Sequence, residues 1–199
     1  MRTGVSPRPF FFDIGLQIQA FDWRHLAPEG NQTPFLLIHG LASNGRMWDG
    51  VGRLLTAAGH PVVAINQRGH GASDKPESGY DFEHVSADLH AIIQQLNWHK
   101  PILVGQSWGG NVVLDVGVRY PEVAGGLVFV DGGILDLHLD PNATWEAARE
   151  RLTPPRMNGI SAETLRQRIS AAHPDWETWG IDAVMANFCL LYTSDAADE

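Results

Sequence analysis

Four short runs of apolar residues stand out along the chain, and each is continuous rather than alternating. They lie at residues 34–40 (PFLLIHG), 61–67 (PVVAINQ), 101–107 (PILVGQS) and 125–133 (GGLVFVDGG). A continuous apolar run of this length is typical of a strand covered on both faces, as in a parallel sheet. The earlier stretch FFFDIGLQIQAFDWR alternates and predicts a hairpin of edge strands, with Gly15 near its turn.

Helical periodicity fills the intervals between these runs. In each of two intervals the apolar residues recur on one helical face: Met47, Val51, Leu54, Leu55 and Ala58, and then Val85, Leu89, Ile92, Ile93 and Leu96. A third helix is expected from Trp108 to about Tyr120, because Pro121 disfavours its continuation. Strands that alternate with helices predict an α/β fold with a doubly wound, mostly parallel sheet.

The pattern changes after Gly133. Residues 134–188 contain no strand-like run, and short helical segments are interrupted at Pro141, Pro154, Pro155 and Pro174. We therefore expect residues 1–133 to form the N-terminal part of an α/β core and residues 134–188 to form a partial helical cap, or lid. The final strands of such a sheet would then be missing from the chain.

The last eleven residues, CLLYTSDAADE (189–199), resemble one reading frame of a transposon-based sequencing adapter. The alternative is a natural helix end followed by an acidic tail. We favour the adapter, and residues of that origin are excluded from reasoning about the fold. The prediction is a C-terminally truncated fragment whose own coding sequence ends near residue 188.

Composition narrows the class of protein. The formal net charge of −9 disfavours binding to nucleic acid or to an anionic membrane surface. No apolar run is long enough to span a bilayer, and the N-terminus lacks the pattern of a signal peptide. The single Cys precludes an intrachain disulfide, and no Cys/His spacing typical of a metal site occurs. We expect a cytoplasmic protein without metal or cofactor, acting on a small molecule.

The segment GQSWG (residues 105–109) fits the pattern G-x-S-x-G and joins a predicted strand to a predicted helix. Such a turn strains the backbone of Ser107, so small neighbours at Gly105 and Gly109 are needed. It also places the serine at the carboxyl end of a central strand, where α/β sheets bind ligands. The alternative is a serine that only caps the helix between tightly packed glycines.

The segment IHGLAS (residues 38–43) ends the first central strand. A glycine at this point lets the backbone turn sharply and exposes the N–H of Leu41. Together with the N–H of Trp108 it would give two donors for an oxyanion. We interpret His39 as a residue that orients this loop, not as a base; the alternative is an ordinary loop over a buried histidine.

The segment NQRGHGASDKP (residues 66–76) follows the next strand. Arg68, His70 and Asp74 are expected to brace a glycine-rich turn through hydrogen bonds. We assign no chemistry to this loop.

Together HGLAS, NQRGHGASDKP, GQSWGG and RYPEVAGGLVFVDGG resemble the α/β-hydrolase superfamily over roughly residues 10–135. The resemblance implies that Ser107 is the nucleophile and that Leu41 and Trp108 supply the oxyanion hole. The branches that use an aspartate nucleophile are disfavoured, because Ser107 occupies that position. Members of the superfamily order their catalytic triad as serine, acid, then histidine.

The histidine of such a triad follows the last strand, so we expect it to be absent from this chain. Neither His138 nor His173 lies where the fold would place the base. Asp131 ends the strand after the nucleophile helix, where some members carry the triad acid. The alternative for Asp131 is a carboxylate that braces the loops at the rim of the site.

The sequence thus predicts a serine hydrolase whose default substrates are carboxylic esters. Carbon–carbon bond hydrolysis, cofactor-free peroxidation and acyl transfer use nearly the same residues. An apolar part of the substrate is suggested by residues that either line a pocket or pack within the lid: Leu135, Leu137, Trp145, Trp176 and Trp179. The alternative function is a ligand-binding protein with little or no turnover. We predict weak solubility and negligible esterase activity for the 199 residues.

Overall fold

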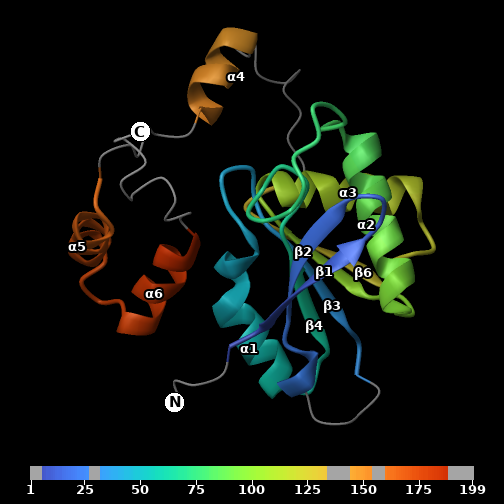
Figure 1. The fold of residues 1–199 in the computed structure, drawn as a ribbon, viewed down its shortest axis with the longest axis horizontal. Helices are drawn as coiled ribbons and strands as arrows, with labels where there is room; N and C mark the ends of the chain where they lie inside the picture. The colour runs from blue at the N-terminus through green and yellow to red at the C-terminus, as the bar shows by residue number, and fades with distance from the viewer. Residues whose placement is uncertain (1–5, 27–31, 134–143, 154–159, 188–199) are drawn as a thin grey trace.

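The computed structural model describes residues 6–26, 32–133, 144–153 and 160–187. Within these ranges a six-stranded sheet has the order β1-β2-β4-β3-β5-β6 (Figure 1). The strands are β1 Arg8–Asp13, β2 Gln17–Asp22, β3 Phe35–Ile38, β4 Val62–Ile65, β5 Ile102–Gln106 and β6 Gly126–Val130. Strands β4, β3, β5 and β6 are parallel to one another, and the first two are antiparallel additions. The predicted mostly parallel sheet and the four strands predicted at residues 34–40, 61–67, 101–107 and 125–133 are confirmed.

The N-terminal hairpin is present, with Gly15 in its turn at a φ of 85°. The expectation that both of its strands lie at an edge is wrong for β2. This strand also pairs with β4, where Ala20 lies opposite Ile65 and Phe21 opposite Ala64. Ala20 and Phe21 are both buried, so β2 is covered on both faces like a central strand.

The helical segments of the described ranges begin and end as follows: η1 Arg24–Leu26, η2 Gly45–Trp48, α1 Asp49–Ala57, α2 Phe82–Leu96, α3 Trp108–Arg119, α4 Trp145–Leu152, α5 Ala162–Ala172 and α6 Thr178–Asn187. Helix α2 buries the five apolar residues that its periodicity predicted. Its first turn is capped by the Asp81 side chain, which accepts a hydrogen bond from the N–H of His84. The prediction for α3 is confirmed to within one residue.

The apolar face predicted for α1 is only partly buried. Val51 is 41% exposed and Leu54 65% exposed, whereas Gly52 and Thr56 are buried. A Cβ on Gly52 would lie 3.0 Å from the indole ring of Trp23. The helix is therefore turned away from the predicted orientation, because Gly52 lets its backbone approach Trp23 closely.

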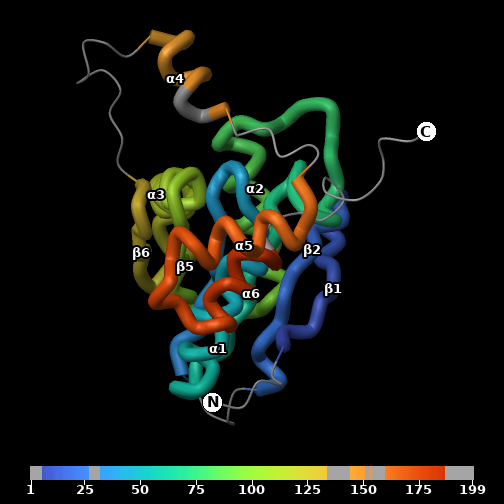
Figure 2. The backbone as a smooth tube through the Cα atoms, turned by 90° about the vertical axis from the view of Figure 1, so that its left-hand side faces the viewer, coloured from blue at the N-terminus to red at the C-terminus, as the bar shows by residue number. Residues whose placement is uncertain are grey.

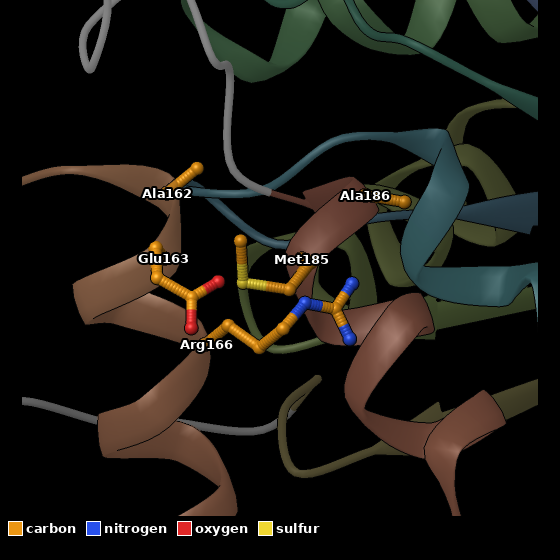
Figure 3. Close-up of a pocket in the computed structure, with 5 residues that line it drawn as sticks. All are labelled: Ala162, Glu163, Arg166, Met185 and Ala186. Carbon is orange, nitrogen blue, oxygen red and sulfur yellow. The ribbon is translucent and has the colours of Figure 1, made fainter.

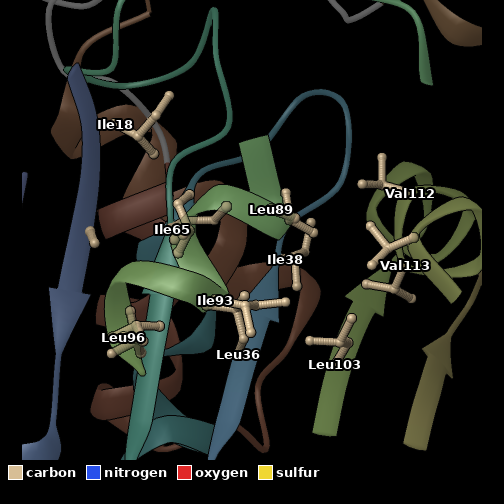
Figure 4. Close-up of a cluster of buried hydrophobic side chains, with 14 of the residues drawn as sticks. Ile18, Leu36, Ile38, Ile65, Leu89, Ile93, Leu96, Leu103, Val112 and Val113 are labelled. Carbon is tan, nitrogen blue, oxygen red and sulfur yellow. The ribbon is translucent and has the colours of Figure 1, made fainter. Parts of the chain in front are cut away.

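The two faces of the sheet are covered by different helices, as a doubly wound fold requires. Leu36 and Ile38 of β3 belong to a large apolar cluster with α2 and α3, which Figure 4 shows in close-up. Leu37 points to the opposite face, into a second cluster that contains Trp23 and Trp48. Burial on both faces explains why β3 is continuously apolar in sequence.

Strand β6 lies at the end of the strand order and has exposed apolar side chains. Its residues Val128, Phe129 and Val130 are exposed. In the described part of the chain β6 pairs with β5 alone. An apolar edge of this kind promotes association with other chains. The weak solubility of the 199 residues stays a prediction.

Helices α4, α5 and α6 follow the proline-interrupted pattern expected of the C-terminal part. Helix α5 packs on α6, and α6 lies against η2 and α1 (Figures 1 and 2). Leu165, Ile181 and Met185 form a small apolar cluster between α5 and α6. The assignment of this part as a lid stays a prediction, and residues 189–199 with the adapter-like sequence lie outside the described ranges. No helix in the part of the chain described is long and apolar enough to cross a membrane.

Candidate active site

Ser107 lies in a sharp turn between β5 and α3, as the GQSWG pattern predicted. Its backbone has φ 50° and ψ −119°, a region that residues with a Cβ rarely adopt. The Ser107 N–H donates to the carbonyl of Val130 at 2.9 Å, and its carbonyl accepts from the N–H of Gly110 at 2.9 Å. These bonds on both sides hold the strained residue in place, with its side chain half-buried.

Glycines surround the turn because backbone atoms approach it closely. A Cβ on Gly105 would overlap the carbonyl group of Gly109. A Cβ on Gly109 would lie 2.5 Å from the carbonyl oxygen of Ile38. The predicted need for small residues at both positions is confirmed. Sequence reasoning missed Gly132, where a Cβ would lie 2.7 Å from Ser107 Cα, although its DGG segment was visible after β6.

The segment that leads to one predicted oxyanion donor, Leu41, lies beside the serine, and the other, Trp108, directly follows the serine in the chain. A Cβ on Gly40 would be 3.2 Å from Ser107 Cβ, so the backbone that leads into Leu41 passes beside the hydroxyl-bearing side chain. Trp108 is the first residue of α3, and its ring stacks on Phe82 with centroids 4.6 Å apart. Within the described ranges, no hydrogen bond engages the N–H of Leu41 or of Trp108. The roles of Leu41 and Trp108 as oxyanion donors stay predictions.

His39 is fully buried and holds the loop that precedes Leu41. Its Nδ1–H donates to the carbonyl of Gly40 at 2.7 Å, and its Nε2 accepts from the N–H of Gln67 at 3.1 Å. Burial, and next the nearby His70, lower the pKa of His39 from 6.5 to about 3. A neutral ring with both nitrogens engaged orients the loop and does not act as a base, as predicted.

The lowered pKa of His39 predicts a pH-dependent stability. The unfolded chain takes up a proton on His39 near pH 6.5, whereas the folded chain keeps this ring neutral to about pH 3. The stability that His39 contributes is therefore full above pH 6.5 and is lost as the pH falls, at about 1.4 kcal/mol per pH unit. In urea unfolding between pH 7 and 5, we expect the wild type to lose about 2 kcal/mol more than His39→Asn. An equal dependence of the free energy of unfolding on pH in the two proteins would contradict the assignment of this pH effect to His39.

The segment NQRGHGASDKP braces a turn, as predicted. Arg68 makes a two-pronged ion pair with Asp88 of α2, with N–O distances of 2.7 and 2.6 Å, and both side chains are buried. The hydrogen bonds from Arg68 to Asp88 raise the pKa of the arginine further. Asp74 accepts a hydrogen bond from the N–H of Gln17 at 2.8 Å. The sequence did not indicate Asp88 as the partner, because α2 is separated from this loop along the chain.

A complete triad is not assembled among the described residues. There, no histidine forms a hydrogen bond with Ser107 Oγ. Asp131 directly follows β6, is exposed and has a φ of 52°, and its carboxylate has no hydrogen bond to another described residue. His173 stacks on Trp176 with ring centroids 3.8 Å apart, and His138 lies outside the described ranges. The role of Asp131 as triad acid and the absence of the triad histidine stay predictions.

The tryptophans expected either to line an apolar pocket or to pack within the lid are largely exposed. Trp145 is 75% exposed, and Trp179 donates its indole N–H to Glu177. Leu135 and Leu137 lie outside the described ranges. One hollow of about 270 Å³ lies between α5 and α6 and is lined by Ala162, Glu163, Arg166, Met185 and Ala186 (Figure 3). Ser107 is not among the described residues that line it. In the ranges described, no cluster of three or more His, Cys, Asp or Glu side chains could hold a metal ion.

The fold and the site define a class of protein: an α/β protein whose mostly parallel sheet presents a strained serine at the end of a central strand. The model of the alpha/beta hydrolase fold family matches residues 33–169, and the chain belongs to this family. The crystal structure of an E-2-(acetamidomethylene)succinate hydrolase superposes with a TM-score of 0.68 at 23% identity, covering 91% of this chain and 64% of that one.

Two curated relatives match part of the chain. The 2-(acetamidomethylene)succinate hydrolase of Mesorhizobium japonicum is 31% identical over 103 residues, which are 52% of this chain and 37% of that protein. The non-heme chloroperoxidase of Burkholderia pyrrocinia is 33% identical over 92 residues, which are 46% of this chain and 32% of that protein. The matched segments thus span about a third of these relatives' own length.

Proposed function

We propose that a full-length protein containing this chain is a serine hydrolase that cleaves carboxylic esters or related acyl substrates. The observation that carries the proposal is the strained backbone of Ser107, with the Gly40 backbone beside its side chain. A residue held at a rare φ and ψ by bonds on both sides is typical of a functional position.

In the proposed reaction Ser107 Oγ attacks the carbonyl carbon of the substrate. The oxyanion that forms accepts hydrogen bonds from the N–H groups of Leu41 and Trp108, and the N-terminus of α3 favours this negative charge. The alcohol leaves, and water then cleaves the acyl-enzyme. A histidine must take the serine proton, and Asp131 is a candidate for the acid that orients this histidine.

The test is hydrolysis of p-nitrophenyl esters of increasing acyl length by the full-length protein. We expect saturable turnover that rises with acyl length if the substrate has an apolar part. Tight binding of an apolar ester without any turnover would favour the ligand-binding alternative. The 199 residues by themselves are expected to show negligible hydrolysis, because a serine without an imidazole partner is a weak nucleophile.

A second candidate is transfer of the acyl group to hydrogen peroxide in place of water, which yields a peracid. It is favoured by the similarity to a relative named non-heme chloroperoxidase. With acetate, peroxide and bromide, the peracid formed would oxidise bromide, so halogenation of a dye reports this activity. Ester hydrolysis without halogenation would leave the hydrolase as the function.

A further inference from the structure

Three consecutive carbonyl groups at the end of β3 each accept a hydrogen bond from a side chain. The side-chain amide of Gln67 donates to the carbonyl of His39 at 2.7 Å. His39 Nδ1 donates to the carbonyl of Gly40, and His70 Nε2 donates to the carbonyl of Leu41 at 2.6 Å. The loop from His39 to Leu41 is therefore held at each successive peptide.

The orientation of a carbonyl determines the orientation of the next N–H, because a trans peptide is planar and its two groups point in opposite directions. The bond from His39 to the Gly40 carbonyl thus turns the N–H of Leu41 away from the His39 ring. The bond from His70 to the Leu41 carbonyl holds the following peptide. Leu41 is consequently fixed on both sides of its Cα.

His70 belongs to the NQRGHGASDKP loop, far from β3 in sequence, and it is built into position. Its Nδ1 lies 3.0 Å from the carbonyl of Arg68, and its ring meets the ring of His39 edge-on with centroids 4.7 Å apart. Arg68 is in turn anchored to Asp88 by the buried ion pair. Arg68 and His70 thus lie two residues apart in a loop that contacts both helix α2 and the backbone beside Ser107.

We propose that His70 is a positioning residue: its bond to the Leu41 carbonyl fixes the peptide after Leu41, and together with the His39 bond to the Gly40 carbonyl it keeps the Leu41 N–H aligned for the oxyanion. The proposal rests on the proposed function, in which Leu41 is an oxyanion donor. It goes beyond the bracing expected of this loop, since the bond of His70 reaches the carbonyl of Leu41 in the loop beside Ser107. Arg68 and Asp74 also bond outside the loop, to Asp88 of α2 and to the N–H of Gln17 in β2, whereas His70 contacts the loop after β3.

The first test is structural and needs no activity. In the full-length protein, NMR of a sample labelled with ¹³C and ¹⁵N measures the Leu41 carbonyl carbon and the Leu41 amide. His70→Phe keeps the ring but removes the donor, so both signals are expected to shift, the carbonyl upfield. His70→Gln keeps an N–H near the position of Nε2 and is expected to restore both signals.

His60 offers a matched control, because its Nδ1 donates to the carbonyl of Thr33 at 2.9 Å in another loop. His60→Phe is expected to leave the Leu41 signals unchanged. Leu41 signals that are the same in His70→Phe and in the wild type would overturn the proposal.

The second test uses kinetics of the full-length protein. His70→Phe is expected to lower kcat for ester hydrolysis about 10- to 100-fold with little change in KM, because a misplaced oxyanion donor weakens the transition state more than substrate binding. His70→Gln is expected to recover most of kcat. If His70→Phe lowers kcat, raises KM and lowers the melting temperature together, and His70→Gln does not restore them, the role of His70 is purely structural. If the wild type hydrolyses no ester, the proposed function fails, and the NMR result still decides the role of His70.

Discussion

Replacing Ser107 by alanine in the full-length protein is expected to lower kcat/KM for ester hydrolysis by about 10⁴-fold or more, with the fold intact. Removal of Oγ eliminates the atom that forms the acyl-enzyme, while the oxyanion donors and the substrate contacts remain. The residue is half-buried and its side chain makes no hydrogen bond to another described residue. The substitution is therefore expected to change the free energy of unfolding only slightly. Ester hydrolysis at saturating and limiting substrate measures the effect.

Ser78→Ala is the matched control, because Ser78 is exposed in the loop before α2. This variant is expected to keep the wild-type kcat/KM. Equal turnover by Ser107→Ala and the wild type would show that another residue performs the chemistry. It would also leave the strained turn without a catalytic explanation.

Gly105→Ala is expected to destabilise the folded chain by about 3 kcal/mol or more. The new Cβ would overlap the carbonyl group of Gly109 and lie 2.5 Å from the backbone nitrogen of Gly110. Both obstructing groups are backbone in the first turn of α3, so they move only if the helix separates from the sheet. Urea unfolding followed by circular dichroism measures the loss.

Gly126 provides the comparison, since it lies on the neighbouring strand β6 in the same sheet. A Cβ there would be 3.1 Å from Cδ1 of Ile102, which is the end of a side chain that can rotate. Gly126→Ala is expected to change the free energy of unfolding by less than about 1 kcal/mol. An equal loss in both variants would mean that any added methyl in the sheet is costly and that the turn at Ser107 is not specially crowded.

The sequence predicted the parts of the fold that depend on local pattern. The central strands are continuously apolar because helices cover both of their faces, and the strained turn at Ser107 depends on glycines close to it in sequence. The periodicity of α2 predicted its buried face because Val85, Leu89 and Ile92 all point into the cluster beneath it. In these elements the local pattern and the tertiary environment agree.

The features that the sequence did not predict depend on contacts between distant segments. The orientation of α1 follows from the approach of Gly52 to Trp23, which no periodicity within the helix reports. The pairing of Arg68 with Asp88 and the reach of His70 to Leu41 likewise join segments separated by a strand or a loop. The sequence contained these residues but did not indicate which residues they contact.

Treatment of the full-length protein with a fluorophosphonate, followed by mass spectrometry of its peptides, tests the role of Ser107 most directly. We predict one covalent adduct, located on Ser107, and none on the Ser107→Ala protein. An adduct on a different residue, or labelling of Ser107→Ala at the wild-type rate, would contradict the assignment of Ser107 as the nucleophile.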